Sequence, residues 1–186
     1  MGSVLVILAP GAEEIEAVTI PDVLVRAGQQ VVVASTADTL VVTGSRGIPL
    51  AAHTLLALVL ERTFDLIYLP GGMGSATTCR DDARIQTLAT TQLASGRLLA
   101  VICAAPIALV PRGLATGRRL TSYPGVRAQV EPHAAAWLDQ PVVTDGNLIT
   151  SQGPGTALAL ALHLAHILAG TDVATKIGKD MIAAVV

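Results

Sequence analysis

Cys103 is the residue of this sequence that is best suited to take part in a chemical reaction. It lies in the apolar run LLAVICAAPIALV (98–110), where a β-branched segment gives way to a short helical one. A strand that turns sharply into a helix projects the residue at the turn above the sheet edge, and Ala104, Ala105 and Pro106 suit such a turn. Amides at the start of a helix would favour the thiolate. The alternative is that Cys103 is a small buried apolar residue.

Two glycines could supply hydrogen-bond donors to the same place. Gly71 and Gly72 follow the apolar segment 64–70. Their backbone amides, together with that of Ala104, could form an oxyanion hole, which stabilises negative charge developing on a carbonyl oxygen. The alternative is that the pair only makes a tight turn.

An acidic cluster follows the first apolar segment. Glu13 and Glu14 suit the start of a helix, where carboxylates complement the helix dipole. Glu16 lies one turn further on, where exposure to solvent is less assured. A carboxyl that is partly buried beside a thiol could hold a proton and donate a hydrogen bond to the sulfur.

The elements that must position these residues alternate between strands and helices. We expect core strands at 3–9, 30–35, 64–70 and 97–103, helices at 13–28, 82–96 and 156–170, and hairpin-like pairs within 40–52 and 140–152. This alternation predicts one α/β domain over residues 1–186, with a doubly wound, mostly parallel sheet. Ligands of such sheets bind beyond the carboxyl ends of the strands, where all three motifs fall.

The composition excludes several classes of protein. Hydrophobic residues make up 52% and charged residues 14% of the chain, which favours a compact parallel-sheet protein or an oligomer. A net charge of −2 argues against nucleic-acid binding, which requires an excess of positive charge. No apolar run reaches about 18 residues, so no membrane span is expected. The first apolar stretch is too short for a signal peptide, and we expect a soluble cytoplasmic protein with both cysteines reduced.

Four motifs occur in an order that resembles the ThiJ/PfpI superfamily. They are LAPGAEEIEAV (8–18), LPGG (69–72), AVICAAP (100–106) and TSQGPGTA (150–157). The similarity runs from about residue 3 to residue 170 and is strongest to the YajL-like branch, which is similar to the human parkinsonism-associated deglycase. The resemblance implies a flavodoxin-like α/β fold, a homodimer and no cofactor.

The resemblance also implies roles for individual residues. The reactive cysteine falls on Cys103, the protonated glutamate that hydrogen-bonds its sulfur falls on Glu16, and the oxyanion amides fall on Gly72 and Ala104. Protease-like members carry a histidine directly after the cysteine, so an alanine at position 104 argues against peptidase activity.

Four further residues are candidate contacts with substrate or at a dimer seam. They are Gly71, Arg46, Arg26 and Tyr123. The human relative carries a histidine where Tyr123 stands, so this chain lacks an obvious imidazole base. Proton transfer would then depend on Glu16, substrate or water.

Other residues of reactive or metal-binding types have simpler interpretations. His163 and His166 are three residues apart on the last expected helix, but no third ligand stands at a suitable spacing, so no metal site is expected. Cys79 is expected in a loop or at a helix start, in a surface or packing role.

Two functions remain open at this point. The first is an enzyme in which Cys103 adds to a small 2-oxoaldehyde such as methylglyoxal, or to early glycation adducts of thiols and amines, through a hemithioacetal. The second is an oxidation-responsive sensor or chaperone, in which Cys103 oxidises to the sulfinic acid and Glu16 stabilises it. A role in thiazole metabolism is suggested only by the ThiJ name.

Overall fold

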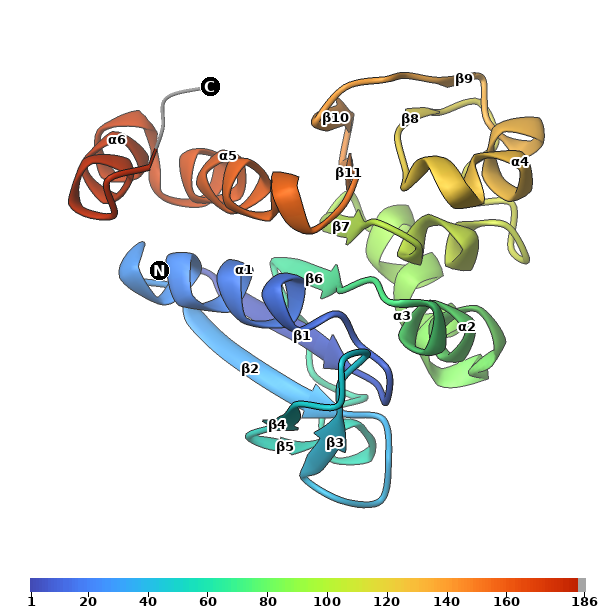
Figure 1. Ribbon diagram of the computed structural model, residues 1–186, viewed down its shortest axis with the longest axis horizontal. Coiled ribbons are helices and arrows are strands. Elements are labelled where there is room, and N and C mark those ends of the chain that lie inside the picture. Colours follow the sequence, from blue (N-terminus) through green and yellow to red (C-terminus); the bar gives the residue numbers. More distant parts are fainter. Residues whose placement is uncertain (184–186) are drawn as a thin grey trace.

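A seven-stranded sheet organises the molecule (Figure 1). The computed structural model describes residues 1–183. The strands lie in the order β10–β11–β7–β6–β1–β2–β5, and all neighbours pair in parallel except β10 and β11. Their bounds are β1 (Ser3–Leu8), β2 (Gln30–Ser35), β5 (Thr54–Leu55), β6 (Leu66–Leu69), β7 (Leu98–Ile102), β10 (Val142–Asp145) and β11 (Leu148–Ser151). The predicted doubly wound, mostly parallel, flavodoxin-like sheet is confirmed.

The central strands are apolar on both faces because helices cover both sides of a parallel sheet. Every residue of β6 is buried, and β1 and β7 are buried except at their first residues. Strand β1 pairs with β2 on one side and β6 on the other, so the direction of winding reverses there. Such a reversal opens a crevice at the carboxyl ends of the strands.

Helices pack in two groups. Helix α1 (Glu14–Arg26) packs against α5 (Ala157–Ala169), which in turn packs against α6 (Thr171–Asp180). Figure 1 shows α1 lying beside α5. Helix α2 (Met73–Asp81) packs against α3 (Ala83–Ala94) and against the 3-10 helix η2 (Ala105–Leu109), so the loops after β6 and β7 lie together.

Shorter elements lie between the strands and helices of the main sheet along the chain. The excursion expected within 40–52 is a hairpin of β3 (Val41–Thr43) and β4 (Pro49–Ala51). Strands β8 (Arg119–Leu120) and β9 (Ala136–Trp137) form a second small sheet. The connecting turns are η1 (Leu56–Leu58), η3 (Pro124–Val126), α4 (Arg127–Val130), η4 (Glu131–His133) and η5 (Pro154–Thr156).

Three α-helices were not predicted: α2, the short α4 and α6. Helix α2 begins directly after Gly72, and Cys79 lies in its last turn with no exposed surface rather than in a loop or at a helix start. Burial raises the pKa of the Cys79 thiol to about 12, so this cysteine has a packing role. Helix α6 follows Gly170, after the last expected helix, in a segment for which no element was predicted. Within residues 1–183, no helix is both long and apolar enough to cross a bilayer.

Candidate active site

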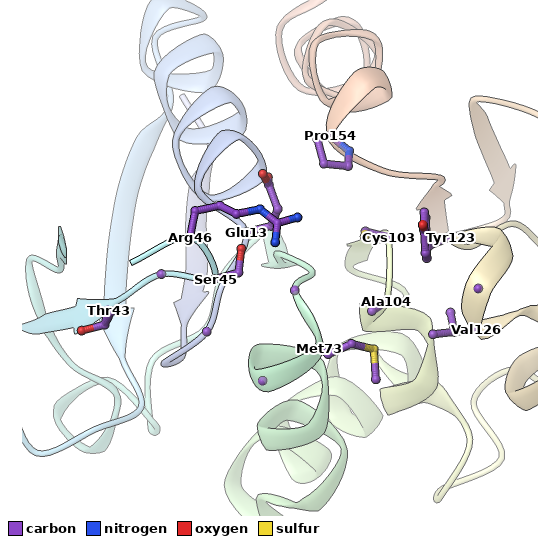
Figure 2. Close-up of a pocket in the computed structure, with 15 residues that line it drawn as sticks. Glu13, Thr43, Ser45, Arg46, Met73, Cys103, Ala104, Tyr123, Val126 and Pro154 are labelled. Carbon is purple, nitrogen blue, oxygen red and sulfur yellow. The ribbon is translucent and has the colours of Figure 1, made fainter. Parts of the chain in front are cut away.

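The loops that follow β1, β6 and β7 meet around one cleft of about 900 Å³. Figure 2 shows the hairpin loop with Arg46 on one side of this cleft and Cys103 with Tyr123 on the other. The lining residues are Gly11, Glu13, Thr43, Gly44, Ser45, Arg46, Gly72, Met73, Gly74, Cys103, Ala104, Tyr123, Gly125, Val126 and Pro154. The cleft therefore brings together the three motifs that the sequence placed at strand ends.

Cys103 occupies the predicted elbow between β7 and η2. Its backbone has φ 62°, in the left-handed region that residues with a side chain rarely adopt. Two backbone hydrogen bonds hold it there: its N–H donates to the carbonyl of Ser151 (2.9 Å), and its carbonyl accepts from the N–H of Tyr123 (2.8 Å). The side chain is 9% exposed and lines the cleft. This conformation costs about 1–2 kcal/mol and is typical of functional sites.

Glu16 lies on the first turn of α1 and is completely buried. Its Oε2 accepts a hydrogen bond from the N–H of Gly71 at 2.8 Å. Its Oε1 is buried and has no hydrogen-bond partner among the described residues, although the carboxyl as a whole is close enough to the Cys103 thiol to interact with it. A buried carboxylate oxygen without a donor is costly, so the arrangement suits a carboxyl that carries a proton.

The surroundings of Glu16 fix its backbone as well. The carboxylate of Glu13 caps the helix by accepting the N–H of Glu16 at 2.8 Å, as expected of an acid at this position. The buried Tyr68, on β6, donates its hydroxyl to the carbonyl oxygen of Glu16 at 3.1 Å. Contacts from the helix start and from the sheet therefore hold Glu16 against the cysteine loop.

The pKa values of Glu16 and Cys103 are coupled. Burial raises the pKa of Glu16 to about 7, against the opposing effect of the Gly71 amide. Burial, followed by the negative charge of Glu16, raises the pKa of the Cys103 thiol to about 12, while the amides of Gly72 and Ala104 act in the opposite direction. The free thiolate favoured by the sequence is therefore not the resting form beside an ionised Glu16. Near neutral pH the thiol therefore keeps its proton, while Glu16 changes between its protonated and ionised forms.

The two glycines after β6 are needed for this contact. A Cβ on Gly71 would lie 2.6 Å from both Cys103 Cβ and Glu16 Oε2, closer than real Cβ atoms approach other atoms. Gly72 has φ 83°, and a Cβ there would collide with the backbone of Gly11 and Glu13. Only glycine therefore lets β6 end directly against the cysteine and the carboxyl.

The remaining predicted site residues divide into two groups. Arg46 and Tyr123 line the cleft, as expected of residues that contact substrate. Gly71 does not line it, because its amide is directed at Glu16. Arg26 lies in the last turn of α1, at the far end of the helix from Glu16, and pairs with Asp22 on the exposed surface. Its position excludes contact with this cleft and leaves a role at a dimer seam as a prediction.

Two residues of the site region were not foreseen. The Tyr68 hydroxyl could have been suspected, since a tyrosine within a buried aliphatic strand needs a hydrogen-bond partner. Glu14 was expected only to complement the helix dipole. Instead, its carboxylate accepts hydrogen bonds from the hairpin loop at Ser45 and Arg46.

The two paired histidines lie outside the cleft. His163 Nε2 is 2.8 Å from the hydroxyl of Thr144, and His166 Nδ1 is 3.2 Å from that of Thr171. Across residues 1–183, no three His, Cys, Asp or Glu side chains gather in a metal-binding cluster.

Comparisons with known proteins show the family and the fold of this chain. The model of the DJ-1/PfpI family matches residues 2–167. Protein dj-1beta of Drosophila melanogaster is 43% identical over 182 residues, covering 98% of this chain and 97% of its own. Its crystal structure gives a TM-score of 0.95 at 42% identity, with 99% of each chain covered.

Two further relatives carry descriptions that bear on function. The glutathione-independent glyoxalase DJR-1.2 of Caenorhabditis elegans is 36% identical over 180 residues, covering 96% of this chain and 95% of its own. The structure of an oxidised Toxoplasma gondii DJ-1 gives a TM-score of 0.94 at 39% identity, with both chains fully covered. This chain belongs to the DJ-1/PfpI family.

Proposed function

We propose that this protein is a protective enzyme that converts reactive 2-oxoaldehydes to 2-hydroxy acids without glutathione or another cofactor. The observation that carries the proposal is the pairing of Cys103 with the buried Glu16 at the edge of a large cleft. A carboxyl with a pKa of about 7 can both accept and donate a proton near neutral pH. The relationship to a glutathione-independent glyoxalase supports the same reaction class.

The first step is addition of sulfur to the aldehyde carbon. Because the thiol retains its proton beside an ionised Glu16, the carboxylate takes that proton as the sulfur attacks. The new C–S bond forms as the C=O π bond breaks, and the electron pair moves to oxygen. The amides of Gly72 and Ala104, which lower the pKa of the Cys103 thiol in the free protein, would stabilise that oxygen. Proton return gives a hemithioacetal.

The second step moves hydrogen between the two carbons. Glu16 removes the C–H proton of the former aldehyde carbon, which gives an enediol, and a proton is added at the neighbouring carbon. The product is a thioester of the 2-hydroxy acid on Cys103. Water then cleaves the C–S bond, so the thiol is restored and the sum is one aldehyde plus one water giving one hydroxy acid. Early glycation adducts of thiols and amines would react with Cys103 through the same addition chemistry.

Oxidation of Cys103 is a second candidate function. Peroxide would add one oxygen to the sulfur to give a sulfenic acid, and a second peroxide would give the sulfinic acid. A protonated Glu16 can donate a hydrogen bond to a sulfinate oxygen, and a relative with 39% identity has been captured in an oxidised form. Peroxide titration with intact-mass analysis tests this: two oxygens should appear on Cys103 before any on Cys79. Oxidation of Cys79 first would contradict it.

We also propose that the protein acts as a homodimer in the cytoplasm. Ile15, Val18 and Val25 lie along one side of α1 and are each more than half exposed. Val41 and Ile48 of the hairpin region are exposed to a similar degree. An apolar surface of this kind is typical of a protein interface. Sedimentation velocity at micromolar concentration should give the mass of two chains, and a monomer there would contradict the dimer.

The enzyme proposal is tested by lactate production from methylglyoxal in the absence of glutathione. Wild type should turn over, whereas Cys103→Ser and Glu16→Ala should each lose activity by at least a hundredfold. Cys79→Ala is the matched control, because it removes the other thiol from a position outside the cleft. Loss of activity in the control but not in Cys103→Ser would contradict the mechanism, and no turnover by wild type would contradict the activity.

A further inference from the structure

The carboxylate of Glu14 holds the hairpin loop in place. Its Oε1 accepts the N–H of Arg46 at 2.6 Å, with a longer contact to the N–H of Ile48 at 3.5 Å. Its Oε2 accepts the hydroxyl of Ser45 at 2.9 Å. A Cβ on Gly44 would lie 2.6 Å from Glu14 Cδ, so a side chain there would displace this carboxylate from its present position. One side chain thus organises the whole turn between β3 and β4.

The same loop is bound to the backbone that leads into α1. The N–H of Gly11 donates to the carbonyl of Thr43 at 2.8 Å, and the N–H of Ser45 donates to the carbonyl of Ala12 at the same distance. Glu14 lies two residues before Glu16 on this helix. The position of the loop relative to the cysteine–glutamate pair is therefore set by the first turn of α1.

This loop forms the wall of the cleft that faces Tyr123. Thr43, Gly44, Ser45 and Arg46 all line the cleft, and Figure 2 shows the Arg46 side chain reaching inward from this wall. Arg46 is the only basic residue among those that line the cleft, and no ion pair with it occurs within residues 1–183. The single acidic residue of the lining, Glu13, already accepts the N–H of Glu16.

The cleft has room for a substrate with a substituent. A volume of about 900 Å³ lies near the upper end of the range for small-molecule sites, far above what methylglyoxal fills. An aldehyde carbon held at Cys103 leaves the remainder of the cleft, including Arg46, for a group further along the molecule. An unpaired guanidinium suits a carboxylate or a phosphate, which it binds through charge-assisted hydrogen bonds.

We propose that Glu14 is a positioning residue that fixes Arg46 to bind an anionic group on an extended 2-oxoaldehyde substrate. The inference rests on the proposed function, since it assumes that the aldehyde reacts at Cys103. Glu14 contacts neither the cleft nor the reacting atoms, and acts through the backbone and neighbouring side chain of the loop.

The test compares substrates that differ in charge. The neutral probe is 2-oxopentanal, and the anionic probes are 4,5-dioxopentanoate, which carries a carboxylate, and 3-phosphooxy-2-oxopropanal, which carries a phosphate. The measured quantity is the ratio of kcat/KM for each anionic probe to that for the neutral one, from formation of the hydroxy acid. Glu14→Ala should lower this ratio about tenfold, mainly through KM, as expected for loss of one charge-assisted hydrogen bond.

Three variants separate positioning from general damage. Glu14→Gln keeps an oxygen that can accept the Arg46 amide, so it should restore most of the ratio. In an Arg46→Ala background, Glu14→Ala should cause little further change, because both substitutions remove the same interaction. Glu61→Ala removes an exposed carboxylate from the segment before β6 and controls for the change in net charge.

The outcomes distinguish this inference from the proposed function. Wild-type turnover of methylglyoxal reports the proposed function alone, and its absence together with that of all three probes overturns both. Equal losses on neutral and anionic probes in Glu14→Ala, or additive effects with Arg46→Ala, overturn the positioning role. If Glu14→Ala does not fold, Ser45→Ala and Arg46→Ala must still lower the ratio. A larger effect on one anionic probe identifies carboxylate or phosphate as the group bound.

Discussion

The raised pKa of Glu16 makes a quantitative prediction about stability. Its folded-state pKa of about 7 lies well above 4.5, the ordinary value for a glutamate in the unfolded chain. Between these values the folded protein binds a proton that the unfolded chain has lost. Stability from this group is therefore fully present below pH 4.5 and is lost as pH rises through 7. Glu16 has no exposed surface, so screening by solvent is small.

The perturbation is Glu16→Gln, which removes the titration and keeps an oxygen for the Gly71 amide. Integrating the linkage relation from pH 5 to pH 8 with these two pKa values gives a loss of about 2–3 kcal/mol in wild type. The variant should lack this loss, while every other titrating group is shared by both proteins. Wild type should therefore lose stability relative to Glu16→Gln as pH rises.

Urea unfolding at pH 5, 6, 7 and 8 measures this difference. The quantity of interest is the free energy of unfolding of wild type minus that of Glu16→Gln at each pH, which cancels errors of extrapolation common to both. It should fall by about 2–3 kcal/mol across the range, with most of the change below pH 7. A difference that stays constant within about 0.5 kcal/mol would refute a raised pKa for Glu16.

Two further predictions concern the contacts around this pair. Gly71→Ala should lower stability by about 1–3 kcal/mol in urea and lower turnover of methylglyoxal at least tenfold, because its Cβ overlaps Cys103 and Glu16; unchanged turnover would contradict the close approach. Tyr68→Phe should cost about 1 kcal/mol of unfolding free energy through loss of the hydrogen bond to Glu16. A neutral effect, with the fold retained by circular dichroism, would show that this bond is replaced by other interactions.

Much of the fold was predictable because its core strands are continuous apolar runs. Residues 3–8, 66–69 and 98–102 are nearly all buried, and their composition distinguishes them from the helices between them. Helix α2 was missed because MGSATTCRD has few large apolar residues and follows two glycines. Helix α6 carries apolar residues one helical turn apart in Val173 and Ile177, but no element was predicted after residue 170.

The candidate site was predictable in part for a different reason. Cys103, Glu16 and Gly72 each belong to a short motif at the end of a parallel strand, so the topology alone brings them to one edge. The partners of Glu14 and Tyr68 lie more than thirty residues away in sequence, and local patterns carry no information about such contacts. The pKa of the thiol also depends on burial, which a helix-start motif does not specify.

At Cys103 the left-handed backbone makes the residue that is needed for the proposed chemistry different from the residue that would be most stable. A glycine there would adopt the same φ without a Cβ penalty, and would be the choice of any procedure that optimised thermal stability alone. Such optimisation would delete the thiol, because Cys103 is one of the two non-glycine residues with a positive φ within residues 1–183. Screens for more stable versions of this protein therefore need a selection for activity as well as one for thermal stability. A higher melting temperature favours glycine at position 103, whereas the proposed activity requires the cysteine.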